Sequence, residues 1–280
     1  GASVIFTDID DTLNMSPMSL ESLITKKTKA IIPVHMLGVP ADMISINKIG
    51  KRFKIPIIED ACEAIGAKVA KKYVGGLSEF GVFSFDFGKM ITTGEGGALF
   101  SKKKNDGKIA RMYHDHGHKN IPDLPRGLDR AGLIGFNYRM TEISGAFGKV
   151  QLGKFPGILK ESKKRYLTLE RYISHNQIKL RHVNLGNEPN YDTFVISIEN
   201  KKLRNRVISL LNQTGFGTKN LPDAFNWHCA YFWKHINKKI RNKEVTNCYN
   251  RLLRCVAIPI LVSRPIIDYK NIASYINELS

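Results

Sequence analysis

A single lysine, Lys89, lies in a loop rich in glycine and threonine, between two apolar runs at residues 82–85 and 98–100. Both runs are typical of short buried strands. A lysine at the end of a buried strand loses hydration, which lowers its pKa, and a neutral amine can attack a carbonyl to form a Schiff base. The same lysine can instead reach water from a turn, and these residues taken alone favour that second interpretation. The remainder of the chain favours the nucleophile.

Acidic residues follow another apolar run. Asp60 and Glu63 come directly after residues 56–58, and His35 follows a further run at residues 30–34. Asp60 in isolation is typical of a helix N-cap. Its position at the end of a strand makes it equally suited to hold a ligand, because ligands bind outside the carboxyl ends of parallel strands.

A helix is expected between those two runs. Apolar residues recur at helical spacing from Met43 to Phe53, and Asp42 precedes them as a candidate N-cap. Strand, helix and strand at this spacing predict a βαβ unit and therefore a parallel sheet. We expect the side chains that end its strands to meet at one edge, namely Asp8, His35, Asp60 and the loop after Ser84.

The first residues suggest a different chemistry. Residues 4–6 predict a strand, and Asp8 and Asp10 follow it. This pattern resembles the first motif of haloacid-dehalogenase-type phosphatases, in which an aspartate nucleophile stands two residues before a second aspartate. Such chemistry needs further carboxylates to hold Mg²⁺, and only Glu59-Asp60 offers a pair. A strand followed by an Asp-rich turn explains the same residues, and both interpretations stay open.

Composition limits the class of protein. The chain has 280 residues, 42% of them hydrophobic, without an apolar run of membrane-spanning length or a secretory signal, and it does not begin with Met. Its formal net charge of +18 is spread over many segments, which does not favour a nucleic-acid face and leaves solvated surfaces or attraction of an anionic substrate. The four cysteines lack CxxC spacing, so we expect reduced thiols in a cytoplasmic protein and no metal site.

Five segments in register resemble one known family. They are PVHMLGVPADM, IPIIEDACEAIGA, FSFDFGKMITTGEGG, HDHGH and GFNYRMTEISGAFGKVQL. Together they are similar to the DegT/DnrJ/EryC1/StrS sugar aminotransferases, and the likeness runs from Val4 to the C-terminal helix. It implies an α/β protein of the aspartate-aminotransferase fold, fold type I, with pyridoxal 5'-phosphate as cofactor. It also implies a mostly parallel sheet in a large domain and a smaller α/β domain.

The resemblance assigns roles to three residues of the central motifs. Lys89 matches the lysine that holds the cofactor covalently and then moves the proton at the reacting carbon. Asp60 matches the carboxylate under the pyridine nitrogen, where an anion keeps the ring protonated. Ser84 matches a hydroxyl that binds the cofactor phosphate. Lys89 also argues against the dehydratase branch, which replaces this lysine with histidine.

Four further site residues rest on the same resemblance. Glu63 stands where the family often has glutamine near the cofactor ring. Asn137 matches a residue that reaches the phosphate of the neighbouring subunit, which implies a homodimer with shared active sites. Arg139 is a candidate at the same edge and equally a structural ion-pair partner. His228, among aromatic residues, is a candidate for substrate contact and equally a packing residue.

The predicted domains are residues 1–152 and residues 153–280, the first lacking its N-terminal part. Family members carry a Ser-Gly-Thr-type turn there that binds the phosphate. The pattern predicts helices over 141–152, 158–175, 202–214, 245–255 and 268–279, a linker over 153–158 and a strand over 193–199.

The implied reaction is amination of a keto sugar, nucleotide-linked or a keto-sugar acid such as 8-keto-Kdo, with glutamate as donor. Surface polysaccharide or antibiotic sugar biosynthesis would use such a product. The alternatives are the phosphatase and a non-catalytic relative of the aminotransferase fold.

Overall fold

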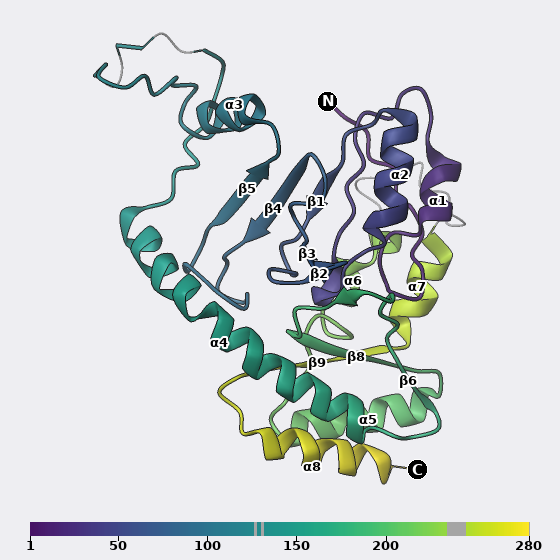
Figure 1. The fold of residues 1–280 in the computed structure, drawn as a ribbon. Coiled ribbons are helices and arrows are strands. Elements are labelled where there is room, and N and C mark those ends of the chain that lie inside the picture. The colour runs from purple at the N-terminus through teal and green to yellow at the C-terminus, as the bar shows by residue number, and fades with distance from the viewer. Residues whose placement is uncertain (126–127, 130–131, 234–244, 280) are drawn as a thin grey trace.

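The computed structural model describes residues 1–125, 128–129, 132–233 and 245–279. The helices are α1 (Pro17–Leu23), η1 (Met36–Gly38), α2 (Met43–Phe53), α3 (Lys104–His114), α4 (Glu142–Tyr172), α5 (Lys201–Gln213), α6 (Phe225–His228), η2 (Ala230–Phe232), α7 (Thr246–Leu253) and α8 (Ile266–Asn277). The strands are β1 (Ile58–Asp60), β2 (Lys68–Val69), β3 (Lys72–Tyr73), β4 (Phe80–Ser84), β5 (Gly97–Ser101), β6 (Ile178–Leu180), β7 (Asn187–Glu188), β8 (Thr193–Ile198) and β9 (Cys255–Pro259). Two sheets, β1-β4-β5 and β6-β8-β9, lie in different halves of the molecule, with α4 running from one to the other (Figure 1).

The first sheet confirms the predicted βαβ unit. Residues 31–35 run parallel to β1, with bridges from Ile31 to Ile57 and from Val34 to Asp60, although Pro33 has no N–H to extend the ladder. The helix between them, α2, begins at Asp42, whose side chain accepts a hydrogen bond from the Ser45 amide as predicted. β1 pairs in parallel with β4, whereas β5 pairs antiparallel to β4. Asp60 and Ser84 therefore end neighbouring parallel strands.

The predicted strand at residues 4–6 is wrong. These residues are extended but form no ladder with the described part of the chain, and Val4 is 54% exposed. An apolar run becomes a strand only where a partner strand can satisfy its backbone groups. Phe6 instead packs edge-on against Trp233, with ring centroids 5.4 Å apart.

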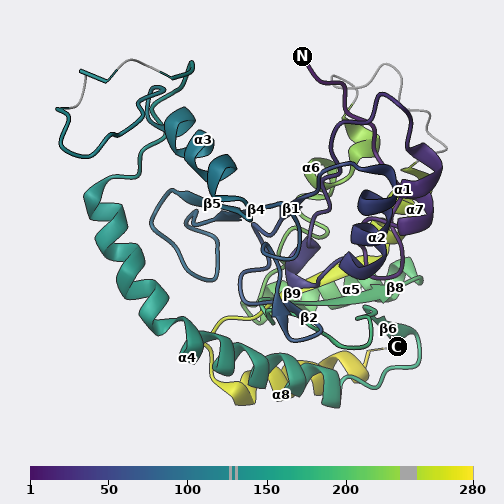
Figure 2. The ribbon, with the colours of Figure 1, turned by 45° about the horizontal axis from the view of Figure 1, so that its top comes forward.

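The second sheet is antiparallel, and it confirms the strand predicted at residues 193–199 and the helix predicted at residues 202–214. The C-terminal half of α4 packs beside α8, as Figure 2 shows. Together with α5 these helices cover a core that includes Tyr166, Leu169, Phe194 and Tyr269. Burial of these apolar side chains away from water is the main driving force for this half of the fold.

One continuous helix replaces the predicted helix, linker and helix between residues 141 and 175. α4 has 31 residues and contains Pro156. A proline removes one hydrogen bond and can kink a helix, but it does not stop a helix whose flanking turns are supported. Thr141 caps the start as predicted, with its hydroxyl accepting from the Ser144 amide. The boundary at residue 152/153 falls inside this helix, and the two-domain division stays a prediction.

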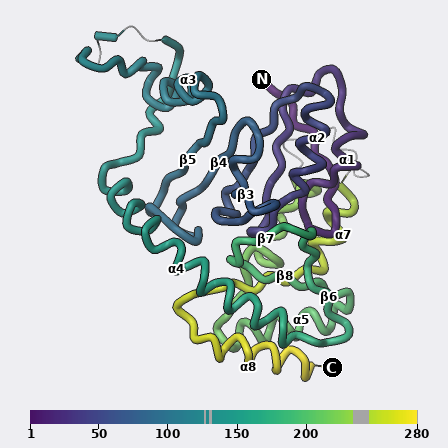
Figure 3. The backbone as a smooth tube through the Cα atoms, viewed as in Figure 1, coloured from purple at the N-terminus to yellow at the C-terminus, as the bar shows by residue number. Residues whose placement is uncertain are grey.

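Further contacts join the two halves. The small sheet β3-β2-β7 pairs residues 68–73 with residues 187–188. A third apolar cluster packs Leu13 and Leu37 against Val195, Leu221 and Leu252. The termini lie at opposite ends of the molecule (Figure 3). No helix in the described ranges is long and apolar enough to cross a bilayer.

Candidate active site

β1 directs two neighbouring carboxylates to opposite sides of its sheet, because successive side chains of a strand alternate. Glu59 is fully buried and accepts hydrogen bonds from the Gly75 amide at 2.7 Å and the Ser78 amide at 2.6 Å. His35 Nε2 lies 3.3 Å from the same carboxylate. Burial opposes ionisation of Glu59, but these hydrogen bonds outweigh it and the pKa of Glu59 is lowered. His35 is therefore an interior residue, and the expectation that it joins the strand-end edge is wrong.

Asp60 faces the other side and lies beside Cys62. One carboxylate oxygen, Oδ1, accepts from the Cys62 amide at 3.1 Å. Burial, and then the Asp60 carboxylate, raise the pKa of the Cys62 thiol to about 12, while the positive charge of Lys89 acts in the opposite direction. Asp60 ends β1, and Lys89 lies in the loop after the neighbouring parallel strand β4, so both come from the same edge of the sheet.

The loop after β4 carries Lys89 and is closed by its own hydrogen bonds. The Phe85 amide donates to Gly96 O at 2.9 Å, and the Thr93 amide donates back to Phe85 O at 2.9 Å. The Lys89 side chain is 20% exposed, with Nζ 3.7 Å from Asp86 Oδ2. Ser84 Oγ accepts from the Asp86 amide at 3.3 Å. Ser84 therefore stands at the base of the loop that presents the lysine.

Glu63 follows Asp60 in the turn after β1. Its two carboxylate oxygens accept from the Leu37 amide at 2.9 Å and from Asn220 Nδ2 at 2.9 Å. The backbone carbonyl of Glu63 accepts from Asn190 Nδ2 at 2.9 Å. Glu63 is thus bound on one side by the turn after residues 31–35 and on the other by segments that flank β8 and α6.

A cavity of about 800 Å³ lies between the Lys89 loop and the second sheet. Glu63 and residues 86–90 line one side, and Ser162, Lys219, Asn220 and Pro259–Ser263 line the other. Lys219 forms an ion pair with Asp192, which also lines the cavity. Two amines, three carboxylates and several hydroxyl and amide groups therefore line one space large enough for a small organic molecule.

Of the predicted site residues only Lys89 and Glu63 line this cavity, and Asp60, Ser84, Asn137, Arg139 and His228 do not. Asn137 forms a β-bridge with Asp115 in the segment before α4 and is exposed. Arg139 lies 2.5 Å from Asp115, which is the structural ion pair allowed as its alternative. His228 is the last residue of α6. The backbone carbonyl of the preceding residue, Trp227, accepts a hydrogen bond from Trp233 Nε1 at 3.1 Å. Their contacts with cofactor or substrate stay predictions.

The two N-terminal aspartates have structural partners. Asp8 accepts from the Cys248 amide at 2.9 Å and the Asn247 amide at 3.4 Å, so it caps the start of α7. Asp10 accepts from the amide and hydroxyl of Thr12 within its own turn. Asp8 is not at the edge with Asp60, contrary to expectation, and neither aspartate lines the cavity. The described residues contain no cluster of three or more potential metal ligands.

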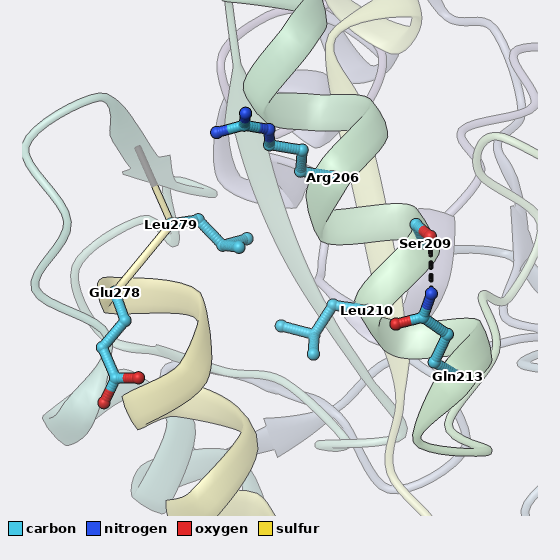
Figure 4. A pocket seen from close by; sticks show the side chains of 6 residues that line it. All are labelled: Arg206, Ser209, Leu210, Gln213, Glu278 and Leu279. Atoms are coloured by element: carbon cyan, nitrogen blue, oxygen red, sulfur yellow. Dashed lines mark hydrogen bonds between the residues drawn. The ribbon is translucent and has the colours of Figure 1, made fainter.

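A second, shallow cavity of about 340 Å³ lies between α5 and the end of α8 (Figure 4). Its polar contact is a hydrogen bond of 3.4 Å from Gln213 Nε2 to Ser209 Oγ. It contains no lysine, histidine or cysteine, so it offers no nucleophile for the chemistry expected of Lys89.

Sequence reasoning missed the polar residues that close the cavity from the second half, which are Ser162, Asp192, Lys219 and Asn220. A weak signal for them was the polar run Thr218-Lys219-Asn220 after the glycines that end α5. Polar residues in such a position are also typical of ordinary turns, so their convergence on Glu63 required the tertiary structure.

Comparisons with known proteins show the family and the fold. The model of the DegT/DnrJ/EryC1/StrS aminotransferase family matches residues 1–274. An aminotransferase from Psychrobacter cryohalolentis has a similar structure, with 23% identity, a TM-score of 0.85 and coverage of 99% of this chain and 75% of that chain. Helicobacter pylori PseC, an aminotransferase involved in the biosynthesis of pseudoaminic acid, has 23% identity and a TM-score of 0.83, covering 97% of this chain and 72% of that chain. The GDP-4-keto-6-deoxy-D-mannose-3-dehydratase of E. coli with bound hydrated PLP has 24% identity and a TM-score of 0.83, covering 97% of this chain and 73% of that chain.

Proposed function

The chain belongs to the DegT/DnrJ/EryC1/StrS aminotransferase family, and from that premise we propose that Lys89 is its catalytic lysine. The protein is a pyridoxal-phosphate-dependent sugar aminotransferase of fold type I. The observation that supports the assignment of the lysine is its place in the loop after β4, where it lines the cavity with Glu63, while Asp60 ends the neighbouring parallel strand β1. A lysine and a carboxylate from two neighbouring strand ends are the groups that this cofactor requires.

The residues around the cavity fit the cofactor. When bound, pyridoxal phosphate supplies an aldehyde for an amine and a ring that withdraws electrons from the reacting carbon. Asp60 would keep the pyridine nitrogen protonated, and Ser84 Oγ would bind the phosphate. Lys89 Nζ would hold the cofactor and would move the proton at the substrate carbon. The cavity of about 800 Å³ leaves room for a sugar beside these groups.

The substrate in this proposal is a keto sugar, nucleotide-linked or a keto-sugar acid such as 8-keto-Kdo, and glutamate donates the amino group. The net charge of +18 favours encounter with an anionic sugar. The product enters the biosynthesis of a surface polysaccharide or an antibiotic sugar, and the enzyme works in the cytoplasm.

The proposal includes a homodimer. Asn137 lies outside the cavity of its own chain, and the start of α4 exposes apolar side chains, such as Ile143 at 84% exposure. Exposed apolar surface of this kind is typical of an interface. In a dimer Asn137 would complete the phosphate site of the partner.

The direct test is spectroscopic. Mixed with pyridoxal phosphate, the protein should gain a near-visible band, and borohydride should fix the cofactor on the peptide that contains Lys89. Lys89→Ala should remove both signals, whereas Lys102→Ala, at an exposed lysine beyond β5, should keep them. A reduced adduct in Lys89→Ala would refute the assignment. A panel of keto sugars with glutamate then identifies the substrate by amine formation.

A further inference from the structure

The Glu63 carboxylate is aimed by two donors that are far apart in the sequence. The Leu37 amide and Asn220 Nδ2 each lie 2.9 Å from one of its oxygens, at separations of 26 and 157 residues. An ionised carboxylate only accepts hydrogen bonds, so both partners must donate. A hydrogen bond to a charged group is stronger than one between neutral groups. The direction of this carboxylate therefore depends on Asn220.

Asn190 has a different task beside Glu63. Asn190 is buried. Its side chain donates to the backbone carbonyl of Glu63, and its backbone amide donates to Gly38 O at 3.0 Å. It thereby fixes the backbone of the turn rather than the carboxylate. Loss of Asn220 would leave this backbone contact in place and free only one carboxylate oxygen of Glu63, because the Leu37 amide still binds the other.

The position of Asn220 is set by the second sheet. The preceding residue, Lys219, donates its amide to Ala257 O in β9 at 2.9 Å, and its side chain pairs with Asp192. Asn220 itself has a φ of +66°, a left-handed conformation that asparagine tolerates better than most residues. Asn220, Glu63 and Lys89 all line the same cavity.

We propose that Asn220 is a positioning residue that holds the Glu63 carboxylate at the cofactor ring and so couples the second half of the molecule to the Lys89 site. The inference rests on the proposed function. Because Glu63 places a negative charge near Lys89, its direction alters both the affinity for pyridoxal phosphate and the protonation of the bound cofactor.

The test exchanges the donor and the acceptor of the hydrogen bond between Asn220 and Glu63. Asn220→Asp keeps the size of the side chain but sets a carboxylate against Glu63. It should weaken binding of pyridoxal phosphate about tenfold and shift the pH midpoint of the near-visible band. Adding Glu63→Gln supplies an amide donor to the new aspartate. The double variant should bind the cofactor within about twofold of Glu63→Gln alone, because the hydrogen bond is restored in reverse.

Two further variants complete the design. Asn220→Gly removes the hydrogen-bond donor, and glycine adopts the positive φ without strain. The variant should therefore show weaker cofactor binding and a shifted pH midpoint while its backbone stays folded. Asn212→Ala, an exposed asparagine on α5, should bind and titrate like the unaltered protein. Circular dichroism checks the fold of each.

Three results would overturn the inference. The double variant could be no better than Asn220→Asp, or Asn220→Gly could leave both the affinity and the pH midpoint unchanged; in either case the proposed function stands. Failure of the unaltered protein to form the Lys89 adduct would remove the proposed function and the inference together.

Discussion

Glu59 and Asp60 are neighbours in β1, yet their carboxylates lie on opposite faces of the sheet and have different partners. Glu59 is buried, where it binds two amides and His35, and Asp60 lies on the opposite face of the strand and accepts from the Cys62 amide. The alternation of side chains along one short strand separates a structural acid from a candidate cofactor-binding one.

The buried acid is expected to stabilise the fold. Glu59→Ala leaves the Gly75 and Ser78 amides without their acceptor in a buried site, and it should lower the free energy of unfolding by about 3–5 kcal/mol. Glu199→Ala, which removes an exposed acid paired with Arg254, should cost less than about 1 kcal/mol. Denaturant unfolding measures both. Equal losses would show that the contacts of Glu59 contribute no more than a surface ion pair.

The same residue predicts a dependence of stability on pH. The pKa of Glu59 is lowered in the folded protein from an ordinary value of 4.5, so the unfolded chain takes up the proton first. The stabilisation is fully present above that value and is lost as the pH falls through the folded pKa. Glu59→Gln should therefore lose less stability than the unaltered protein as the pH falls below about 4.5. Parallel curves of unfolding free energy against pH would contradict this.

Cys62 is expected to be a slow nucleophile despite its partial exposure. Its pKa of about 12 leaves little thiolate at pH 8, so alkylation by iodoacetamide should be about 10³-fold slower than for an ordinary thiol. Peptide mass spectrometry gives the rate, with glutathione as the reference. Lys89→Ala removes the charge that favours the thiolate and should slow alkylation further. A rate near that of glutathione would mean that burial and the Asp60 carboxylate do not raise the pKa of this thiol as described.

Two glycines allow the cost of a strained backbone to be measured separately from the cost of a steric clash. Gly38 has a φ of +79°, and a Cβ there would lie 1.9 Å from Asn190 Oδ1, whereas Gly186 has a φ of +80° with open space around it. Gly186→Ala should cost about 1–2 kcal/mol from the left-handed backbone alone. Gly38→Ala should cost at least 1 kcal/mol more because it also displaces Asn190. Thermal and denaturant unfolding compare the two, and equal costs would show that Asn190 moves aside freely.

The local sequence was sufficient for much of the fold near the site. Helical periodicity and a capping Asp42 gave α2, and apolar runs ending in polar residues gave β1 and β4. The five motifs were sufficient to identify the family. These features are local or ordered along the chain, so a single sequence carries them.

Contacts between residues that are distant in the chain could not be predicted from the sequence. Residues 4–6 have the composition of a strand but pair with no strand among the residues that the structure describes. Residues 153–158 continue a helix because packing at its C-terminal half outweighs one proline. The side chain of His35 lies in the interior, where it contacts the buried carboxylate of Glu59. Asp8 caps the start of α7 and therefore does not lie beside Asp60. Sequence alone named Lys89, Asp60 and Glu63 as candidates, whereas only the tertiary structure could bring Asn190 and Asn220 to Glu63, because hydrogen bonds across more than 120 residues leave no local pattern.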